Sequence, residues 1–238
     1  MKIEVLADPD AVARRAAEII AMDARAAVAA RGRFVMAVSG GHTPGTMLRA
    51  LAQKDIPWSG VHLMQVDERV APAGDPDRNL THLEESLLAH APLSLEQVHA
   101  MPVEACDLGA AAAGYGQTLR GIAGSPPVLD LVHLGLGLDG HTASLVPADP
   151  ALVATEDVAL AGPYQGRRRM TLTYPTLDRA RGILWLVTGV EKAAMLVRLL
   201  AGDRSIPAGR VRQDQALLLA DAAAASGLDP RRSEGRSE

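Results

Sequence analysis

The stretch VLDLVHLGLGLDGHTASL, residues 128–145, joins an apolar run to a turn rich in glycine. The run Val128–Leu134 predicts a buried strand, because a short, mainly apolar segment that ends at glycine is typical of the centre of a parallel sheet. Gly135, Gly137 and Gly140 then predict a tight turn, since glycine adopts backbone conformations that a side chain would exclude. The stretch therefore predicts a strand that ends in a turn where α/β folds bind their ligands.

Similar apolar runs recur along the chain and alternate with helical patterns. Strands are expected at Ile3–Ala7, Phe34–Val38, Val61–Val66, Val128–Leu134, Met170–Thr173, Ile183–Thr188 and Leu217–Ala220. Helices are expected at about Pro9–Ala30, Thr43–Gln53, Leu80–Ala89, Ala105–Ile122, Glu191–Ala201 and Ala222–Ala225. This alternation favours an α/β fold with a mostly parallel sheet and helices on both faces. We predict a single domain over residues 1–228, followed at 229–238 by a charged, disordered tail without apolar side chains.

The composition is that of an ordinary globular protein. The chain has 238 residues, of which 48% are hydrophobic and 22% are charged, and its formal net charge is −4. A negative net charge argues against nucleic acid or an acidic membrane as the main partner. Cys106 is the single cysteine, which excludes an intramolecular disulfide and fits a reducing compartment. No segment has the apolar length of a membrane span, and Glu4 comes too early for a signal peptide, so we expect a cytoplasmic protein.

A glycine loop, SGGHT at residues 39–43, follows the strand expected at Phe34–Val38 and precedes a helix that contains Pro44. The N–H groups of such a loop and the positive end of the helix dipole bind phosphate, and hydroxyl groups add donors. The candidate phosphate-binding residues are Ser39, Gly40, Gly41 and Thr43. The alternative is a tight turn in which Thr43 caps the helix and Pro44 occupies its first position.

The same loop admits a second functional interpretation. Ala37-Val38-Ser39-Gly40-Gly41 nearly matches the G-x-S-x-G turn of serine hydrolases, with Ala37 in place of the first glycine. Ser39 lies early in the chain, however, and no histidine near the C-terminus completes the usual order of the catalytic residues. A serine esterase is therefore the less favoured hypothesis for this loop.

Three charged residues, Asp67, Glu68 and Arg69, follow the strand expected at Val61–Val66. Side chains at the carboxyl end of such a strand point into the crevice where α/β sheets bind ligands, although a solvated loop is the alternative. Asn79 opens the next expected helix and is interpreted as its N-cap.

The glycine turn itself carries the strongest candidate for chemistry. Gly135-x-Gly137-x-x-Gly140 matches the dinucleotide fingerprint, but Asp139 would repel a pyrophosphate and Pro147 would end the required helix too soon. We instead interpret His141 as a general base, held by Asp139 or a nearby carboxylate, because imidazole titrates near neutral pH. The other histidines considered lack metal-ligand spacing and are expected to be structural: His62, His82, His90, His99 and His133.

Cationic side chains occur at two further strand or helix starts. Arg167, Arg168 and Arg169 precede the strand expected at Met170–Thr173. Lys192 lies in the first turn of an expected helix, where a cation opposes the helix dipole. Such a lysine could share a phosphate with the helix N-terminus; a solvated surface lysine is the alternative.

Together these motifs resemble one family. They occur in the order found in the 6-phosphogluconolactonase subfamily of the glucosamine/galactosamine-6-phosphate isomerase family, and the resemblance extends from Ile3 to Leu228. The motifs are Ser39-Gly40-Gly41-x-Thr43-Pro44, Asp67-Glu68-Arg69, Asp139-Gly140-His141-Thr142-Ala143-Ser144-Leu145, Arg169-x-Thr171-Leu172-Thr173 and Gly189-x-x-Lys192-Ala193. Each motif is modest alone, but their common order is highly specific.

The resemblance implies a modified Rossmann-like fold and an activity. The subfamily hydrolyses 6-phospho-D-glucono-1,5-lactone to 6-phospho-D-gluconate, in the oxidative pentose phosphate pathway, without a metal or other cofactor. Carried over residue by residue, His141 would be the base, Asp139 would orient its loop, Arg69 would contact the lactone and Asp67 would line the pocket. The phosphate would be bound by Ser39, Gly40, Gly41 and Thr43, assisted by Arg169 and Lys192. The expected partner is this small lactone, and the expected state is a monomer or weak homodimer.

The sister enzyme of the family, glucosamine-6-phosphate deaminase, is the nearest alternative. It continues after the shared Asp-Gly-His motif with Ile-Ala-Phe-Asn-Glu, where the glutamate assists ring opening. Residues 142–146 here read TASLV and contain no carboxylate, so ring opening lacks its acid. A non-catalytic sugar-phosphate sensor is a further alternative, which the intact Asp139 and His141 disfavour. The chain departs from the family at Arg78, where serine is more frequent, and at Val146, where phenylalanine is usual.

Overall fold

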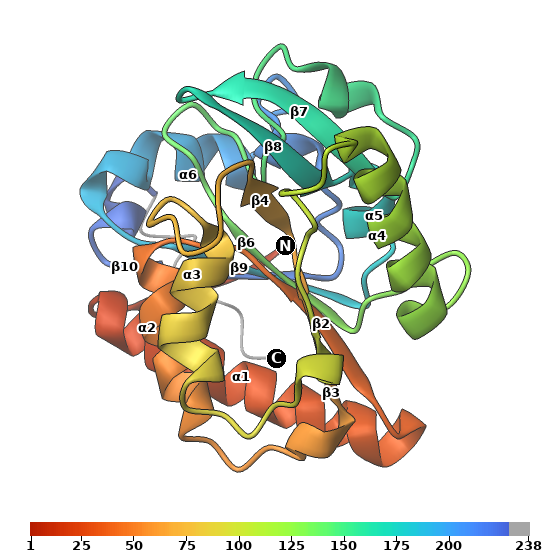
Figure 1. Cartoon of the computed structure of the whole chain (residues 1–238). Helices are drawn as coiled ribbons and strands as arrows, with labels where there is room; N and C mark the ends of the chain where they lie inside the picture. Colours follow the sequence, from red (N-terminus) through yellow and green to blue (C-terminus); the bar gives the residue numbers. More distant parts are fainter. Residues whose placement is uncertain (229–238) are drawn as a thin grey trace.

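A computed structural model describes residues 1–228 of the chain. These residues form two β-sheets and the helices that pack against them (Figure 1). The tail predicted at 229–238 lies outside the described residues. The larger sheet is parallel, in the order β1-β10-β9-β6-β2-β3-β5, with β1 (Lys2–Leu6), β2 (Phe34–Val38), β3 (Val61–Gln65), β5 (Val98–His99), β6 (Leu131–Gly135), β9 (Gly182–Val187) and β10 (Ala216–Asp221). The smaller sheet is antiparallel, in the order β4-β8-β7, with β4 (Asp67–Arg69), β7 (Val158–Tyr164) and β8 (Arg167–Leu172).

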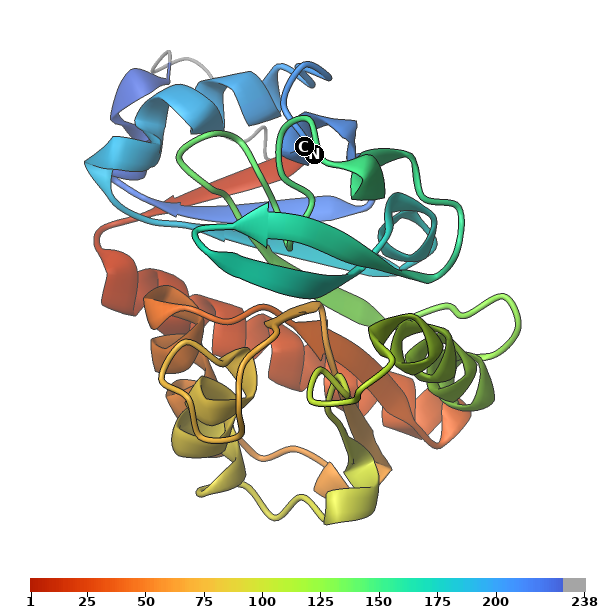
Figure 2. The same ribbon diagram turned by 45° about the horizontal axis from the view of Figure 1, so that its top comes forward.

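Helices cover both faces of the large sheet, which confirms the predicted α/β class. Alternate side chains of β2 face opposite layers: Met36 packs with the layer of α1 and α2, and Ala37 packs with the layer of α4, α5, α6 and the small sheet. In Figure 2, α1 and α2 lie below the large sheet and α6 lies above it. Because both faces are covered, every residue of β2 is buried, which explains its continuous apolar sequence. The helices are α1 (Pro9–Arg31), α2 (His42–Ala52), α3 (Asn79–Leu83), α4 (Leu108–Ala123), α5 (Tyr174–Asp178) and α6 (Ala193–Leu200).

The carboxyl ends of the central strands β9, β6 and β2 open onto one edge of the large sheet, because all three strands are parallel. Loops that follow these strands therefore meet there. The small sheet is fixed against the same edge through Val66, which donates a backbone hydrogen bond to Val38 O (3.0 Å) and accepts one from Leu172 N (2.8 Å). The edge is thus enclosed by three loops and by one face of the small sheet.

The small sheet was only partly predicted. Asp67–Arg69 forms strand β4 rather than a loop, β8 begins at Arg167 rather than at Met170, and β7 was not expected. A run of charged residues carries no apolar alternation, so nothing local marks it as a strand. Pairing with residues 169–171 of β8 supplies the missing stabilisation.

The predicted helix boundaries also need correction. The helix expected at Leu80–Ala89 is α3 followed by a π-helical turn, η2 (Glu84–Leu88), and the one expected from Ala105 begins at Leu108 because Asp107 caps it by accepting the Ala110 N–H (2.9 Å). The C-terminal helix expected at Ala222–Ala225 is a 3₁₀ turn, η7 (Ala224–Gly227), and a 3₁₀ turn, η5 (Val190–Lys192), precedes α6. Among residues 1–228, no helix has the length and apolar character needed to cross a membrane.

Candidate active site

A cleft of about 320 Å³ opens at the carboxyl edge of the large sheet. It is lined by the loops after β2, β6 and β9 and by the small sheet. The predicted site residues that line it are Ser39, Gly40, Asp67, Arg69, His141, Arg169 and Lys192. Three others, Asp139, Gly41 and Thr43, are not part of the lining. The structure therefore brings most of the candidates, from five separate segments, into one cleft.

His141 and Asp139 form a hydrogen-bonded pair at this cleft. The imidazole Nδ1 lies 2.5 Å from Asp139 Oδ1, and the same oxygen accepts the His141 backbone N–H (3.1 Å). Since a carboxylate only accepts, the neutral ring carries its proton on Nδ1 and keeps a lone pair on Nε2. Burial acts to raise the pKa of Asp139, but hydrogen bonds from His141 and Tyr164 outweigh it and hold that pKa below its ordinary value. An imidazole held in this way can accept a proton at Nε2.

The glycines of this turn are required by close contacts. The Gly137 N–H donates to His141 O (2.8 Å), and a Cβ on Gly137 would lie 2.0 Å from His141 Nδ1. Gly140 has φ 81°, and a Cβ there would lie 2.6 Å from Ile206 Cβ. Only glycine lets the backbone pass directly beneath the imidazole, which explains the spacing in the sequence.

The small sheet sets two arginines side by side in the cleft. Arg69 and Arg169 are directly opposite each other in the β4–β8 pairing, so their side chains share one face of the sheet, and both line the cleft. Like charges in this position repel. Within the described residues, the Nε atoms of both arginines are buried and have no hydrogen-bond partner, and burial, followed by the charge of Arg69, lowers the pKa of Arg169. Two neighbouring cations of this kind, one half-buried and one buried, can bind an anion or a polarised oxygen.

Asn79 supports this face and is not the N-cap that the sequence suggested. Its side-chain amide donates to Asp67 O (2.8 Å) and Oδ1 (3.2 Å), and its carbonyl oxygen accepts from Arg69 Nη1 (2.7 Å). Asp67 Oδ2 accepts the Ser144 hydroxyl (2.6 Å). The start of α3 is instead stabilised by the buried carboxylate of Glu68, which accepts the backbone N–H groups of Asn79 (2.7 Å) and Leu80 (2.8 Å).

Arg78, where serine is more frequent in the family that the sequence resembles, helps to hold Glu68 and α3 in place and does not line the cleft. Its side chain is only 2% exposed, and its Nε lies 3.1 Å from Glu68 Oε2. Its Nη1 also donates to Ala71 O (2.8 Å). The departure from the family pattern at this position therefore neutralises a buried carboxylate beneath α3.

The glycine loop is held by β6 and does not form a serine-hydrolase arrangement. The Ser39 hydroxyl donates to the backbone carbonyl of His133 (2.9 Å), while the His133 ring accepts the Ser39 backbone N–H at Nδ1 (3.3 Å). The serine oxygen is therefore not paired with an imidazole base. Gly40 must be glycine, because a Cβ there would lie 1.9 Å from Asn79 Oδ1.

The far end of the loop is tied to the loop after β9. α2 is capped by Gly41 and not by Thr43, whose hydroxyl lies 2.8 Å from the hydroxyl of Thr188. Asp221 accepts the Gly189 N–H (3.1 and 3.2 Å) at the beginning of the segment that ends in Lys192. These contacts place the lysine and the glycine loop on the same cleft.

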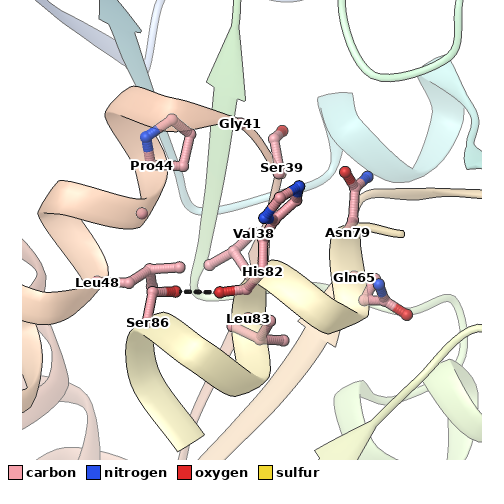
Figure 3. Close-up of a pocket in the computed structure, with 12 residues that line it drawn as sticks. Val38, Ser39, Gly41, Pro44, Leu48, Gln65, Asn79, His82, Leu83 and Ser86 are labelled. Atoms are coloured by element: carbon pink, nitrogen blue, oxygen red, sulfur yellow. Dashed lines mark hydrogen bonds between the residues drawn. The ribbon is translucent and has the colours of Figure 1, made fainter. Parts of the chain in front are cut away.

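A second, very small cavity lies behind the glycine loop, between α2 and the segment formed by α3 and η2 (Figure 3). Its volume of about 10 Å³ leaves room for no more than about one water molecule. Ser39, Gly40 and Asn79 line both this cavity and the main cleft. Side chains therefore pack closely behind the glycine loop, and a ligand the size of a sugar reaches this loop only from the main cleft.

Stability at low pH is expected to depend on His133. Burial lowers the pKa of this ring from 6.5 to about 4, so the unfolded chain binds the proton more readily. The free energy of unfolding should therefore fall as the pH drops from 6.5 towards 4, with up to about 3 kcal/mol from this group. Burial also lowers the pKa values of His62 and His99, which act in the same direction.

Urea unfolding of the wild type and of His133→Asn at several pH values isolates this contribution. The variant should show a smaller loss of stability between pH 6.5 and 4, while the exposed-site control His90→Asn should follow the wild type. Equal pH dependence in wild type and His133→Asn would contradict the assignment.

Sequence reasoning missed Tyr164 and Gln165, which also line the cleft. They end β7 and begin its turn into β8, where Gln165 (φ 53°) and Gly166 (φ 78°) both have left-handed backbone conformations. Such a pair is typical of a two-residue hairpin turn. The Gln-Gly pair was thus an available signal, but Gly162 and Pro163 interrupt the strand pattern before it.

Comparison with known proteins agrees with this architecture. The family described as "Glucosamine-6-phosphate isomerases/6-phosphogluconolactonase" matches residues 7–219. A protein named 6-phosphogluconolactonase from Mycobacterium tuberculosis is 36% identical over 241 residues, covering 95% of this chain and 98% of the relative. The crystal structure of 6-phosphogluconolactonase from Thermotoga maritima has a TM-score of 0.83 and 25% identity, over 92% of this chain and 98% of its own.

The fold alone does not separate the activities of the family. A monomeric glucosamine-6-phosphate deaminase has a TM-score of 0.84 at 19% identity, covering 95% of this chain and 100% of its own. This likeness shows a shared fold only. The family match and the relatives nevertheless cover nearly the whole chain. On this evidence, the chain belongs to the glucosamine-6-phosphate isomerase/6-phosphogluconolactonase family.

Proposed function

We propose that this protein is a 6-phosphogluconolactonase, which hydrolyses 6-phospho-D-glucono-1,5-lactone to 6-phospho-D-gluconate. The observation that carries the proposal is the His141–Asp139 pair in one cleft with Arg69, Arg169 and Lys192. A base for water and cations for a phosphate and a developing oxyanion are what hydrolysis of an anionic lactone requires. The name of the M. tuberculosis relative supports the same activity.

In the proposed mechanism, Lys192, Arg169 and the N–H groups of the glycine loop bind the phosphate and bring the lactone carbonyl to His141. His141 Nε2 removes a proton from water as the water oxygen bonds to C1, and the carbonyl oxygen becomes an alkoxide. The bond between C1 and the ring oxygen then breaks, and the imidazolium returns the proton to that oxygen. General-base catalysis of this kind contributes roughly 10²–10⁴-fold, and positioning supplies much of the remainder.

The remaining charged residues of the cleft have distinct roles in this proposal. Arg69 stabilises the negative charge that develops on the carbonyl oxygen, and its two hydrogen bonds to Asp77 O and Asn79 Oδ1 (both 2.7 Å) hold the guanidinium in place. Asp67 is occupied by Ser144 and Asn79 and serves as a fixed wall of the pocket. Since side chains provide both the base and the charge stabilisation, the proposed reaction uses no metal or other cofactor.

The deaminase alternative is disfavoured by the residues that follow His141. Thr142 is 1% exposed and Ser144 is fully buried, and the Ser144 hydroxyl is committed to Asp67 (2.6 Å). No carboxylate occurs in residues 142–146, so the acid for sugar ring opening is missing from this turn. Lactone hydrolysis, which needs no such acid, fits the segment better.

The direct test is hydrolysis of freshly generated 6-phosphogluconolactone, followed as acid release against the spontaneous rate. We expect acceleration that is proportional to enzyme concentration, and no ammonia release from glucosamine 6-phosphate under the same conditions. A rate equal to the spontaneous one would disprove the proposed function, and ammonia release would favour the deaminase.

Lys192→Ala should mainly raise KM for the phosphorylated lactone. Loss of one charge-assisted contact to a phosphate corresponds to about a 10- to 100-fold change, and the imidazole base is untouched. Initial rates over a range of lactone concentrations measure the effect. The control is Lys54→Ala, a lysine whose surface ion pair with Glu18 (3.7 Å) is remote from the cleft lining. An unchanged KM in Lys192→Ala would show that the phosphate binds elsewhere.

A further inference from the structure

Tyr164 contacts both parts of the proposed catalytic apparatus. Its hydroxyl donates to Asp139 Oδ2 (3.2 Å) and lies 3.4 Å from His141 Nδ1. Its ring meets the His141 ring edge-on, with 5.2 Å between centroids. The Arg169 guanidinium lies over the Tyr164 ring, 5.1 Å from its centroid, and donates to the Tyr164 carbonyl (3.4 Å). Tyr164 therefore contacts both the His141–Asp139 pair and Arg169.

The direction of this side chain is set by an irregularity of the strand. Ala161 is paired with Arg169, but Tyr164 is paired with Arg167, so β7 has one more residue than β8 between these pairs. An extra residue of this kind is a β-bulge, and it reverses which face the following side chains occupy. Without it, Tyr164 would lie on the face opposite to Ala161 and Arg169. The bulge therefore places the aromatic ring on the cleft face.

With the hydrogen bond from Tyr164, both carboxylate oxygens of Asp139 accept hydrogen bonds. Asp139 Oδ1 accepts from the His141 ring and backbone, and Oδ2 accepts from Tyr164. With Tyr164 in place, the carboxylate has little freedom to rotate away from Nδ1, so the proton stays on Nδ1 and the lone pair stays on Nε2. Second contacts of this kind orient catalytic ligands and bases.

We propose that Tyr164 is a positioning residue that holds the Asp139 carboxylate, and through it the reactive tautomer of His141, while its ring supports Arg169. This inference rests on the proposed function for its kinetic readout. The titratable and charged groups around the hydroxyl are Asp139 and His141 on the turn after β6 and Arg169 on β8. The turn after β6 and strand β8, which carry these groups, both pack against Tyr164 at the cleft.

The first test is Tyr164→Phe, which keeps the ring and removes the hydroxyl. We expect kcat to fall about tenfold, as for the loss of one hydrogen bond to a charged group, with little change in KM. The acid limb of the pH–rate profile should move to higher pH, because the Asp139 charge is then balanced by the imidazolium alone. The matched control is Tyr174→Phe, which removes a hydroxyl bonded to Pro207 O (2.9 Å) away from the cleft lining.

A second variant, Tyr164→Leu, removes the ring as well. It should show the same loss of kcat together with a severalfold increase in KM, because the Arg169 guanidinium loses the surface on which it rests. The separation between a kcat effect in the Phe variant and an added KM effect in the Leu variant is specific to the proposed arrangement. A general loss of stability would not produce it.

A readout that requires no turnover separates this proposal from the proposed function. Nitrogen NMR of the His141 ring in the free protein should show the Nδ1–H tautomer in the wild type and in Tyr174→Phe, and a mixture of tautomers in Tyr164→Phe. If the wild type fails to hydrolyse the lactone, the proposed function fails and this spectrum still decides the role of Tyr164. Unchanged tautomer populations in Tyr164→Phe, or an unchanged kcat and pH profile, overturn the inference.

Discussion

His141→Ala is expected to reduce kcat for lactone hydrolysis by at least about 100-fold while leaving the binding of 6-phosphogluconate nearly intact. The imidazole is the only base that the cleft presents with a free lone pair and an orienting carboxylate, Asp139 at 2.5 Å, among the residues that the structure describes. The groups assigned to the phosphate, Lys192 and Arg169, lie on other segments and remain in place. The loss should therefore appear in kcat rather than in affinity.

Steady-state kinetics and calorimetric titration with 6-phosphogluconate measure the two effects of this substitution separately. His90→Ala is the matched control, because this histidine is exposed and does not line the cleft. Near-normal turnover of His141→Ala would remove the imidazole from the mechanism. Loss of product binding together with turnover would assign His141 to binding instead.

Gly137→Ala is expected to lower kcat by a similar factor, at least about 100-fold, although it adds a single methyl group. The new Cβ would lie 2.0 Å from His141 Nδ1 and 2.3 Å from Cε1, so the ring must leave its present position. Moving the ring breaks the bond to Asp139 and withdraws Nε2 from the substrate. A misplacement of about 1 Å at a reacting group is sufficient for losses of this order.

The control for Gly137→Ala is Gly121→Ala in α4, where a Cβ would meet no atom within 4 Å. Alanine at that helix position should leave kcat unchanged and increase stability slightly. Thermal unfolding of both variants distinguishes a displaced ring from a misfolded chain. Full activity in Gly137→Ala would mean that the imidazole does not need its present position.

The part of the site that could be predicted from sequence is the part encoded in neighbouring residues. The apolar run before Gly135 marks the strand, the glycine spacing marks the turn, and Asp139 and His141 are close in sequence as well as in space. The fold class could be predicted for the same reason, because six of the seven strands of the large sheet have their own local pattern; the two-residue strand β5 was not expected. The structure confirms that class.

The part that could not be predicted depends on pairing between distant segments. Arg69 and Arg169 are neighbours only through the β4–β8 ladder, and neither strand start is marked by apolar residues. Asn79 was interpreted as a cap because its own helix was the only context visible; its partners Asp67 and Arg69 lie on another element. Thr43 was interpreted as a phosphate ligand or a cap, but its hydroxyl meets Thr188, on a segment far along the chain.

The bulge in β7 has a consequence for how enzymes built on this architecture diverge. The orientation of one aromatic ring depends on the length of the strand between Ala161 and Tyr164, not on the identity of any catalytic residue. Insertion or deletion of a single codon in this hairpin would rotate the tyrosine out of contact with Asp139 and leave every motif of the family intact. Two descendants with identical motifs would then differ in the hydrogen bonds to the Asp139 carboxylate, a change that a gap in an alignment records and a comparison of motif residues overlooks.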